Sequence, residues 1–383
     1  MALLTARPPS APGARGVLGA VRAALDGAGP AVHLGGAAPV PVPAGVAAVV
    51  TTSGSTGYPK DVLLSRSALI ASASSTAARI GEGAWLLALP ATYVAGLQVL
   101  VRSLLAGHEP AVLEGHFSVE GFVAAARGMA SASHGARTPT YTSLVPAQVS
   151  QLIAAADAPE VRDALGSFEA ILVGGQALPD AVRERAASLG ARIVRTYGAS
   201  ETSGGCVYDG VPLDGVRVRI ADGEVQLSGP MLAEGYRDDP ERTAAAFVRD
   251  VAGQRWYRTG DAGSFDDGRL RVTGRLDNVI VSGGVNVSLD RVERVVRGLP
   301  GFADAVVVGA AHERWGETPV VVVPGEAAAS RAPGRGARRG RRRPRSAGAT
   351  RPHRGGRERP AAVQRQAGPP RASCAHRALI PPQ

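Results

Sequence analysis

Lys60 is the only lysine among the 383 residues of this chain, and it closes a Gly/Ser/Thr-rich run at residues 51–60, T-T-S-G-S-T-G-Y-P-K. Gly54 and Gly57 allow the backbone to bend and to approach a ligand closely, while the hydroxyl groups and the lysine ammonium donate well to phosphate oxygens. Two residues separate the second glycine from the lysine, so the run lacks the Gly-Lys-Ser/Thr order of a Walker A loop. It therefore predicts a polyphosphate-binding loop unlike that of kinases and GTPases.

Four later segments contain further residue types suited to nucleotide binding. The run Y-G-A-S-E-T at 197–202 follows a strand-like segment and combines an aromatic ring, a hydroxyl and a carboxylate at a strand's carboxyl end, where α/β sheets bind ligands. W-Y-R-T-G-D at 256–261 ends in an aspartate suited to a pair of ribose hydroxyls. G-R-L-D at 274–277 supplies an arginine, and S-G-G-V-N at 282–286 offers another close backbone approach. Each segment alone is a weak indication.

The elements that must position these residues change character along the chain. From residue 46 to about 215, apolar strand-like runs alternate with Ala-rich helical ones, which predicts an α/β sheet with helices on its faces. From 216 to 273, short alternating strands separated by D-G and D-D-G turns predict a small β module. The expected elements are a helix at 17–25, a strand at 46–50, alternating runs at 84–90, 97–106, 170–175, 181–189 and 191–198, and, in a new unit, strands at 278–282, 304–309 and 319–323 with a helix at 288–298.

Charge is distributed unevenly along the chain. The formal net charge is +10, but residues 331–383 contain 15 Arg and one acidic residue, Glu358, for a net +14, so residues 1–330 sum to −4. The basic segment lacks apolar periodicity and is rich in Gly and Pro, which is typical of a low-complexity tail. The charge therefore does not mark the body of the protein as a nucleic-acid binder, and no specific nucleic-acid partner is expected.

Cysteine content and hydropathy bear on the compartment. The two cysteines, Cys206 and Cys374, are too few for a disulfide framework and lack metal-ligand spacing, which fits a reducing cytosol. Apolar stretches fall short of 18 residues, and the first ten residues lack the order of a secretory signal. We predict a cytoplasmic protein without a membrane partner; the sequence carries no signal for an oligomeric state.

The order and spacing of the motifs at residues 46–325 resemble those of the adenylate-forming superfamily of acyl-CoA synthetases, luciferases and peptide-synthetase adenylation domains. The resemblance implies that ATP activates a carboxylic acid as an acyl-adenylate, that pyrophosphate leaves, and that the thiol of coenzyme A then displaces AMP. It also implies a large N-terminal α/β domain with the β module (1–276) and a small α+β C-terminal domain, incomplete here (277–325). A disordered Arg/Pro/Gly-rich tail (326–383) would follow.

The resemblance assigns a role to each matching position. The β- and γ-phosphates would be held by Thr52, Ser53, Gly54, Ser55, Thr56, Gly57 and Lys60. Adenine would be flanked by Gly174, Gly175 and Gln176 and stacked on Tyr197, beside Gly198. Ser200 would touch the α-phosphate, Glu201 would hold Mg²⁺, and Asp261 would take both ribose hydroxyls with help from Arg275. Asp277 would be the hinge between the two domains, and Gly283 and Gly284 would line the pantetheine tunnel. The catalytic groups would be Lys60, Glu201 and Arg275.

Structural roles compete with these chemical ones. Tyr197 also suits the core at a strand end, Asp261 suits a turn, and Arg275 suits a solvated surface. Glu201 is also the kind of charge that a helix N-terminus favours. Cys206 is expected to be a small buried hydrophobe, because no histidine lies near it in the sequence to activate a thiol.

Narrower signals resemble one branch, the short bacterial o-succinylbenzoate–CoA ligases of menaquinone biosynthesis. They are L-P-A-T-Y-V-A-G-L-Q-V-L-V-R-S at 89–103, T-S-L-V-P-A-Q at 142–148 and the run at 197–215. The resemblance makes the following residues candidates for the acyl pocket: Tyr93, Gly96, Arg102, Ser143, Gly204 and Gly205. For Tyr93 and Arg102, packing or a solvated face explains the residue as well as substrate contact does.

The C-terminal part departs from the family pattern. Family members place a second lysine near the end of the small domain, where it bridges the incoming carboxylate and the α-phosphate, whereas this chain has no lysine after position 60. The planar fork of an arginine does not reproduce an ammonium. The loss of periodicity near Gly325 is typical of an out-of-frame reading of GC-rich DNA. We therefore hypothesise a frameshifted or degenerate C-terminus with less than full activity, which an intact reading frame with matching protein mass would disprove.

Three functions remain open on this basis. The first is an acid–thiol ligase acting on o-succinylbenzoate with ATP, Mg²⁺ and coenzyme A. The second is another aryl- or acyl-CoA ligase or an adenylation enzyme, which a panel of carboxylic acids would separate from the first. The third is a weakly active or non-enzymatic protein whose basic tail binds nucleic acid; such binding would be steeply salt-dependent and would vanish on deletion of 326–383.

Overall fold

The structure is a computed structural model that describes residues 3–9, 13–53, 59–129, 132–133, 136–299, 301–302, 305–323 and 377–379. The centre of the predicted phosphate loop, comprising Gly54, Ser55, Thr56 and Gly57, lies outside the described residues, as does the side chain of Ser53. Apart from 377–379, the predicted tail at 326–383 also lies outside them.

The first sheet carries the two strands that flank the predicted phosphate loop. It has the order β17-β5-β4-β2-β1-β3, with parallel β1–β2 and β2–β4 pairs and an antiparallel β4–β5 hairpin. Thr52 pairs with Lys60 in that hairpin. Its strands are β1 (Leu3–Arg7), β2 (Ala31–Leu34), β3 (Val40–Pro43), β4 (Val46–Ser53), β5 (Pro59–Ser65) and β17 (Gly235–Tyr236), and α1 (Gly13–Asp26) packs against β2 and β4.

The second sheet has a parallel centre and two antiparallel strands at one end, in the order β14-β13-β12-β11-β10-β6-β7. Runs such as A-W-L-L and A-I-L-V are buried along their whole length, as expected for strands covered on both faces. Its strands are β6 (Ala84–Leu87), β7 (Ala111–Val112), β10 (Thr140–Leu144), β11 (Ala170–Val173), β12 (Ile193–Ala199), β13 (Gly204–Tyr208) and β14 (Val211–Pro212). Strands β8 (Ala132–Ser133) and β9 (Ala136–Arg137) pair with each other and form a separate two-stranded sheet.

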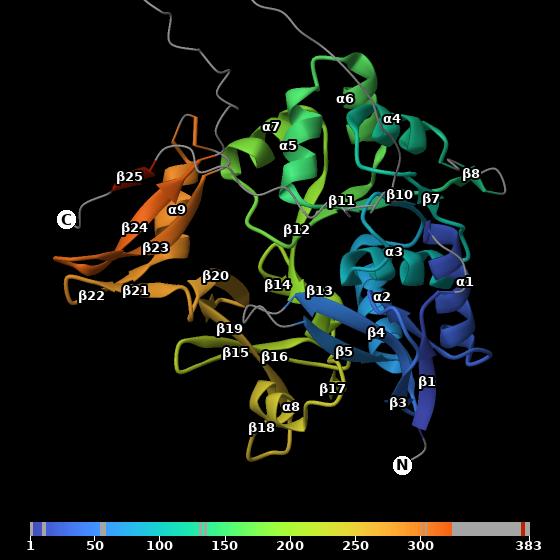
Figure 1. The fold of residues 1–383 in the computed structure, drawn as a ribbon. Coiled ribbons are helices and arrows are strands. Elements are labelled where there is room, and N and C mark those ends of the chain that lie inside the picture. The colour runs from blue at the N-terminus through green and yellow to red at the C-terminus, as the bar shows by residue number, and fades with distance from the viewer. Residues whose placement is uncertain are drawn as a thin grey trace, which may run out of the picture.

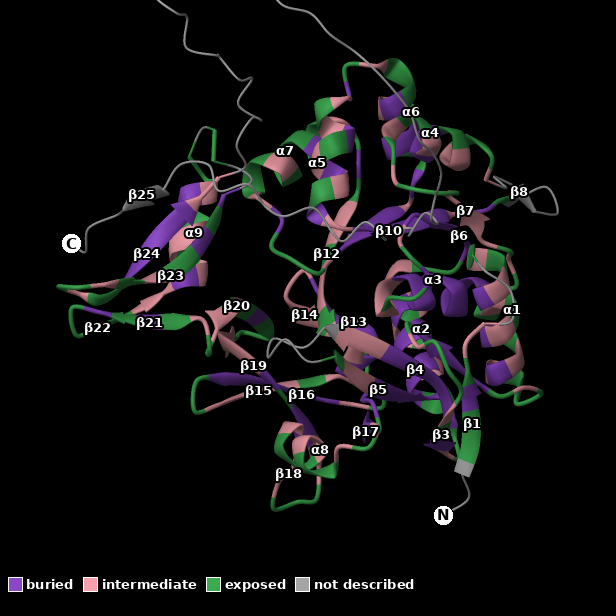
Figure 2. Ribbon diagram, in the orientation of Figure 1, coloured by how far each residue is buried: buried purple, intermediate pink, exposed green. Residues whose placement is uncertain are grey.

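Helices cover both faces of the second sheet (Figure 1). On one side, α2 (Arg66–Ile80) and α3 (Val94–Leu105) lie between the two sheets and share one apolar core with them. On the other side a second core forms under α4 (Val119–Arg127), α5 (Pro146–Ala154), α6 (Pro159–Ser167) and α7 (Asp180–Ser188). Figure 2 shows β10 between these layers as buried, and β6 and β11 are buried along their whole length as well, whereas most of β12 is intermediate. This arrangement places the carboxyl ends of the parallel strands at one edge, where ligands bind in such sheets.

The β module follows, with turns that its sequence predicts. Asp222-Gly223 and Asp267-Gly268 link consecutive antiparallel strands and have positive φ at both positions, the geometry of a type I′ hairpin turn. The module comprises β15 (Arg217–Ala221), β16 (Glu224–Ser228), α8 (Pro240–Ala246), β18 (Phe247–Arg249), β19 (Arg255–Asp266) and β20 (Arg269–Arg275). The sequence prediction of short alternating strands is confirmed here.

A smaller unit follows β20. Its sheet has the order β22-β21-β24-β23, with β25 paired to β24, and α9 covers an apolar cluster on it. Its elements are β21 (Val279–Ser282), β22 (Val285–Ser288), α9 (Leu289–Arg297), β23 (Val306–His312), β24 (Gly316–Val322) and β25 (Arg377–Leu379). The predicted combination of a large α/β part with a β module and a small α+β part is thus confirmed, although β25 brings three residues of the predicted tail into the sheet.

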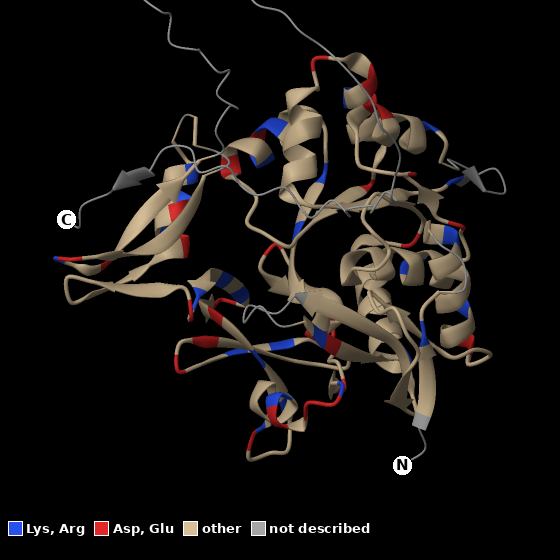
Figure 3. Cartoon of the chain, in the orientation of Figure 1, with Lys and Arg blue, Asp and Glu red and all other residues tan. Residues whose placement is uncertain are grey.

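Two general features of the surface bear on function. Figure 3 shows acidic and basic residues interspersed along the described part of the chain, consistent with a mildly acidic body. Among the described helices, none combines the length and apolarity needed to cross a bilayer.

Candidate active site

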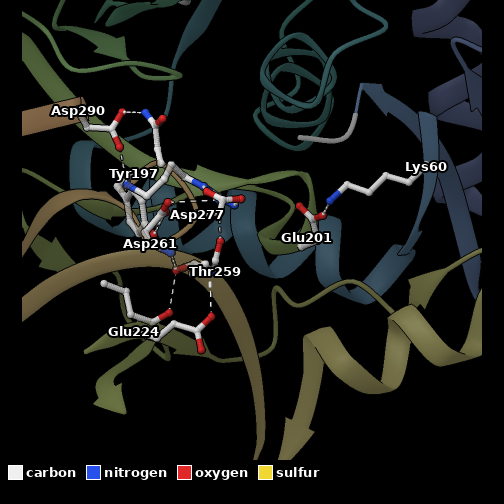
Figure 4. A network of polar contacts seen from close by, with 12 residues as sticks. Lys60, Tyr197, Glu201, Glu224, Thr259, Asp261, Asp277 and Asp290 are labelled. Atoms are coloured by element: carbon white, nitrogen blue, oxygen red, sulfur yellow. Dashed lines mark hydrogen bonds and ion pairs between the residues drawn. The ribbon is translucent and has the colours of Figure 1, made fainter. Parts of the chain in front are cut away.

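Lys60 and Glu201 form an ion pair between the two sheets. Lys60 is at the start of β5, directly after the loop, and Glu201 lies in the 3₁₀ turn η1 (Ser200–Thr202) after β12. Lys60 Nζ is 2.5 Å from Glu201 Oε1, and only 3% of Glu201 is exposed (Figure 4). The structure thus brings together the predicted phosphate cation and the predicted metal ligand, which are 141 positions apart in the sequence.

Local hydrogen bonds fix the turn that carries Glu201. Thr202 Oγ1 accepts from the backbone N–H of Ala199 at 2.8 Å and donates to the carbonyl of Gly204 at 2.7 Å. Ser203 then takes a left-handed conformation with φ 51°, and the backbone carbonyl of Glu201 accepts from Ala233 N at 2.8 Å. The sequence S-E-T-S-G therefore folds into a tight turn that holds the carboxylate in place.

Tyr236 is a member of this group that the sequence analysis missed. Its hydroxyl donates to Glu201 Oε1 at 2.9 Å, and Lys60 Nζ lies 3.4 Å from the same hydroxyl and 4.8 Å from the ring centroid. Burial, reinforced by the Glu201 charge, raises the pKa of Tyr236 above its ordinary value, so the hydroxyl remains a donor. Only the pairing of β17 with the edge of β5 brings Tyr236 here, and no local pattern in the sequence signals it.

A single carboxylate at this place fits Mg²⁺. In the described residues, the hydrogen bonds to the Glu201 carboxylate all fall on Oε1, so Oε2 is available to a cation. Mg²⁺ commonly takes one or two protein carboxylates and completes its shell with water and substrate phosphates. A cavity of about 290 Å³ adjoins the pair and is lined by Pro59, Lys60, Asp61, Tyr236, Arg237, Asp239 and Arg242.

Asp261, Tyr197 and Arg275 form the second cluster. Tyr197 OH donates to Asp261 Oδ2 at 2.6 Å, and Arg275 Nη1 donates to Asp261 Oδ1 at 3.3 Å (Figure 4). Burial raises the pKa of Asp261, although the tyrosine and arginine contacts oppose this shift, and burial also raises the pKa of Tyr197. The residues that the resemblance assigns to adenine and ribose are therefore in direct contact.

Glu224 supports the irregular part of β19 that carries Asp261, and sequence reasoning missed it as well. It is 5% exposed on β16, and its Oε1 accepts from the backbone N–H of Gly260 at 2.9 Å. Its Oε2 accepts from Arg258 Nε at 2.8 Å. The backbone N–H of Asp261 is held by Thr259 Oγ1 at 3.0 Å. The position of the ribose candidate is therefore set by neighbouring strands of the β module.

The remaining nucleotide and hinge candidates lie around these clusters. Gly174, Gly175 and Gln176 follow β11, next to the strand that bears Tyr197, and Gly175 and Gln176 are exposed. Arg275 donates two hydrogen bonds of 3.0 Å to the Asp277 carboxylate and thereby lowers the pKa of Asp277.

Three further candidates lie in turns: Ser200, predicted to touch the α-phosphate, and Gly283 and Gly284, predicted to line the pantetheine tunnel. Ser200 opens η1, immediately before Glu201. Gly283 and Gly284 form the turn between β21 and β22 with positive φ at both positions, so a turn requirement also explains them.

The acyl-pocket candidates lie on or beside α3, β10 and β13. Gly204 faces the side chains of Gln98 and Val94 in the first half of α3, and Gly205 follows it on β13. Gly96 packs against the carbonyl of Pro90, just before the same helix. Tyr93 precedes α3 and is 61% exposed, and Ser143 is buried on β10.

Arg102 is on the same helix as Gly96, and its predicted place in the acyl pocket stays a prediction. It lies in the last turn of α3, at the opposite end from Gly96, and is buried against the Trp85 ring at 5.0 Å. Its guanidinium also lies within 3.4 Å of the Tyr208 hydroxyl on β13, to which Arg102 Nη2 donates. Arg102 is therefore held between α3, β6 and β13.

Cys206 is 1% exposed on β13, and burial raises its pKa to about 12. The prediction that it is a buried apolar residue is confirmed. In the described part of the chain, moreover, no cluster of three or more histidine, cysteine or acidic side chains is arranged to hold a metal ion.

The fold and this site agree with a family match. A model described as AMP-binding enzyme matches residues 14–237, which is more than half of the chain. The chain therefore belongs to the AMP-binding enzyme family.

Named relatives narrow the comparison. The "Probable 2-succinylbenzoate–CoA ligase" of Mycobacterium tuberculosis (strain H37Rv) is 43% identical over 289 residues, which cover 73% of this chain and 70% of the relative. The 2-succinylbenzoate–CoA ligase of Escherichia coli K12 is 32% identical over 292 residues, covering 73% of this chain and 59% of that protein.

Solved structures give the same comparison. Bacillus subtilis MenE, an o-succinylbenzoate CoA synthetase in complex with the acyl-adenylate OSB-AMP, superposes with a TM-score of 0.61 at 29% identity. That match covers 72% of this chain and 58% of the solved one. An E. coli MenE variant with bound OSB-AMS also gives a TM-score of 0.61 at 29% identity, with 75% and 61% covered. This chain thus spans about six tenths of the length of these solved relatives.

Proposed function

We propose that this protein is an ATP-dependent acid–thiol ligase that converts o-succinylbenzoate to o-succinylbenzoyl-CoA, a step of menaquinone biosynthesis. The observation that carries the proposal is the 43% identity to the M. tuberculosis protein over 73% of this chain. The contacts of Lys60 with Glu201 and of Tyr197 with Asp261 support it, because they join the motifs of one nucleotide site. A cytoplasmic location is part of the proposal, supported by the low cysteine content.

The proposed reaction has two steps. In the first, a carboxylate oxygen of the acid attacks the α-phosphorus of ATP and the bond to pyrophosphate breaks. In the second, the thiol of coenzyme A attacks the acyl carbon, loses its proton and releases AMP. Lys60 would neutralise the β- and γ-phosphates, Asp261 would bind the ribose hydroxyls, and Tyr197 would stack on adenine. Mg²⁺, held by Glu201, would offset the negative charge that accumulates between the carboxylate and the phosphate.

AMP formation tests the proposal directly. We expect AMP to appear only when o-succinylbenzoate, coenzyme A and Mg²⁺-ATP are all present, and we expect Lys60→Ala to reduce the rate by about 100-fold or more, the scale of losing one electrostatic contact in a transition state. Arg183→Ala, which removes an exposed cation on α7, serves as the matched control. ATP–pyrophosphate exchange that does not respond to o-succinylbenzoate but responds to another acid in a panel would reject this substrate.

A further inference from the structure

Asp290 lies outside the nucleotide-binding motifs, yet it holds the segment that joins the β module to the smaller unit (Figure 4). This carboxylate is in the first turn of α9. Its Oδ2 accepts from the backbone N–H of Arg275 at 2.6 Å, and its Oδ1 accepts from Asn278 Nδ2 at 2.7 Å. The two donors stand on either side of Asp277, the predicted hinge. Asp290 therefore brackets the hinge from the C-terminal unit.

The approach of α9 to this segment is close. Gly274 has φ +155°, and a Cβ at that position would stand 2.8 Å from Asp290 Oδ2 and 2.9 Å from Asp290 Cβ. The backbone N–H of Leu289 donates to the carbonyl of Asn278 at 3.0 Å. Arg294 Nη2 donates to the carbonyl of Thr273 at 3.1 Å. The start of α9 is thus docked on residues 273–278 by several hydrogen bonds, with Asp290 at the centre.

Arg275 is held from two sides. Its backbone is bound by Asp290, while its guanidinium donates to the carbonyl of Thr259 at 2.9 Å and to Asp261 Oδ1 at 3.3 Å. The same guanidinium makes the paired contact with Asp277. The Arg275 N–H is therefore held by the C-terminal unit at the end of β20, where Arg275 also pairs with Asp261 on β19, and its side chain is held at the ribose candidate. Loss of the Asp290 contact would loosen the strand end from which that side chain extends.

We propose that Asp290 is a positioning residue that couples the C-terminal unit to nucleotide binding, because it fixes the backbone from which Arg275 reaches Asp261. The inference rests on the proposed function, since it takes Asp261 as the ribose ligand. Coupling between two sites is reciprocal in free energy. A nucleotide that binds better when Arg275 is in place must therefore also stabilise the contact of α9 with residues 273–278.

Asp290→Asn tests this coupling in the full chain. An asparagine keeps one acceptor oxygen and places an NH₂ donor where the other oxygen stood, so one of the two N–H donors loses its partner. We expect hydrogen exchange over residues 274–278 to become about tenfold faster, and AMP to bind about three- to tenfold more weakly by calorimetry, the scale of one lost hydrogen bond. AMP should slow exchange in this segment in the unmodified chain. Glu313→Gln, an exposed carboxylate in the turn between β23 and β24, is the matched control.

Each outcome decides one part of the inference. If hydrogen exchange over residues 274–278 is as slow in Asp290→Asn as in the unmodified chain, the positioning role is wrong. If that exchange is faster but the affinity for AMP is unchanged, the coupling is wrong. Hydrogen exchange over β10 and β11 should be the same in Asp290→Asn and in the unmodified chain, which would show that the fold is intact. If it differs, Asn278→Ala is the second variant. It removes only one of the two donors to Asp290 and should speed exchange over residues 274–278 by a smaller factor. Failure of the unmodified chain to bind AMP would reject the proposed function instead, while exchange in Asp290→Asn would still report on the contact.

Discussion

Glu201 is a buried carboxylate with two donors on one oxygen, Lys60 Nζ at 2.5 Å and Tyr236 OH at 2.9 Å. In the proposed reaction Lys60 and Glu201 must separate, because the ammonium of Lys60 binds phosphates and the carboxylate of Glu201 binds Mg²⁺. When Mg²⁺-ATP separates them, the tyrosine hydroxyl is the side-chain donor that remains on Glu201. At the scale of residues, Tyr236 is therefore expected to orient the metal ligand.

Tyr236→Phe should raise the Mg²⁺ concentration that gives half-maximal AMP formation by about tenfold or more, because one hydrogen bond to a charged group contributes about 1.5 kcal/mol or more. The Michaelis constant for o-succinylbenzoate should change little. Tyr141→Phe is the matched control, since its buried hydroxyl also makes one hydrogen bond, to the carbonyl of Ile80 at 2.8 Å, and not to Glu201. An unchanged Mg²⁺ dependence in Tyr236→Phe would contradict the orienting role.

At the scale of elements, the β4–β5 hairpin must hold its loop at a fixed place, and Asp61 ties it to neighbouring strands. Asp61 Oδ1 accepts from Thr51 Oγ1 at 2.6 Å across the hairpin, and Oδ2 accepts from Arg237 Nε at 2.9 Å. His33 on β2 lies 3.7 Å from the same oxygen. Burial alone would raise the pKa of Asp61, but the hydrogen bonds from Thr51 and Arg237 and the arginine charge outweigh it and lower the pKa.

The sign of this shift gives a pH prediction. A carboxyl whose pKa is lower in the folded state contributes stability above its unfolded pKa, about 3.9, and loses that contribution as the pH falls through the folded value. Asp61→Asn should therefore lower the free energy of unfolding by about 1–3 kcal/mol at pH 5 and by progressively less toward pH 3. Urea unfolding at both pH values measures this. Asp238→Asn, an exposed partner of the same arginine, should cost less than about 1 kcal/mol, and a difference independent of pH would refute the account of Asp61.

At the scale of the whole molecule, the contacts of the two candidate clusters come from residues up to Asp277, and the C-terminal unit reaches them through the hinge segment and α9. The family resemblance also calls for a second lysine from the small domain, and the sequence has none after position 60. Nucleotide binding and acyl-adenylate formation should therefore separate in this chain. Binding needs the large part and the contact of α9 with the hinge segment, whereas adenylation is expected to need the second lysine as well.

A chimera tests that separation. Replacing residues 324–383 with the corresponding C-terminal segment of the M. tuberculosis relative should increase ATP–pyrophosphate exchange by about tenfold or more, because a charge placed on the reacting phosphate acts in the transition state. AMP affinity should stay within about twofold, since no replaced residue belongs to the two clusters. A matched chimera whose segment has its lysines changed to alanine should show no gain. Equal exchange rates for the two chimeras would rule out the lysine as the cause.

The sequence by itself determined the order of the α/β part, the β module and the last unit, and the chemical types of the site, although sequence reasoning missed β1, β2 and β3. The strand at 46–50, the α/β alternation, the D-G turns of the β module and the unit after residue 277 depend on short-range patterns of apolar and turn residues, which are readable locally. The resemblance of the motifs around Lys60, Tyr197 and Asp261 gave the family for the same reason, because each motif is contiguous.

The tertiary structure decided which of these residues meet. Glu201 and Tyr236 are 141 and 176 positions from Lys60, and they reach it through the order of strands in two sheets. The placement of Arg102 in the core follows from where the last turn of α3 lies against Trp85. Such contacts depend on strand order and helix docking, which are set by the packing of the whole chain and leave no local pattern in the sequence.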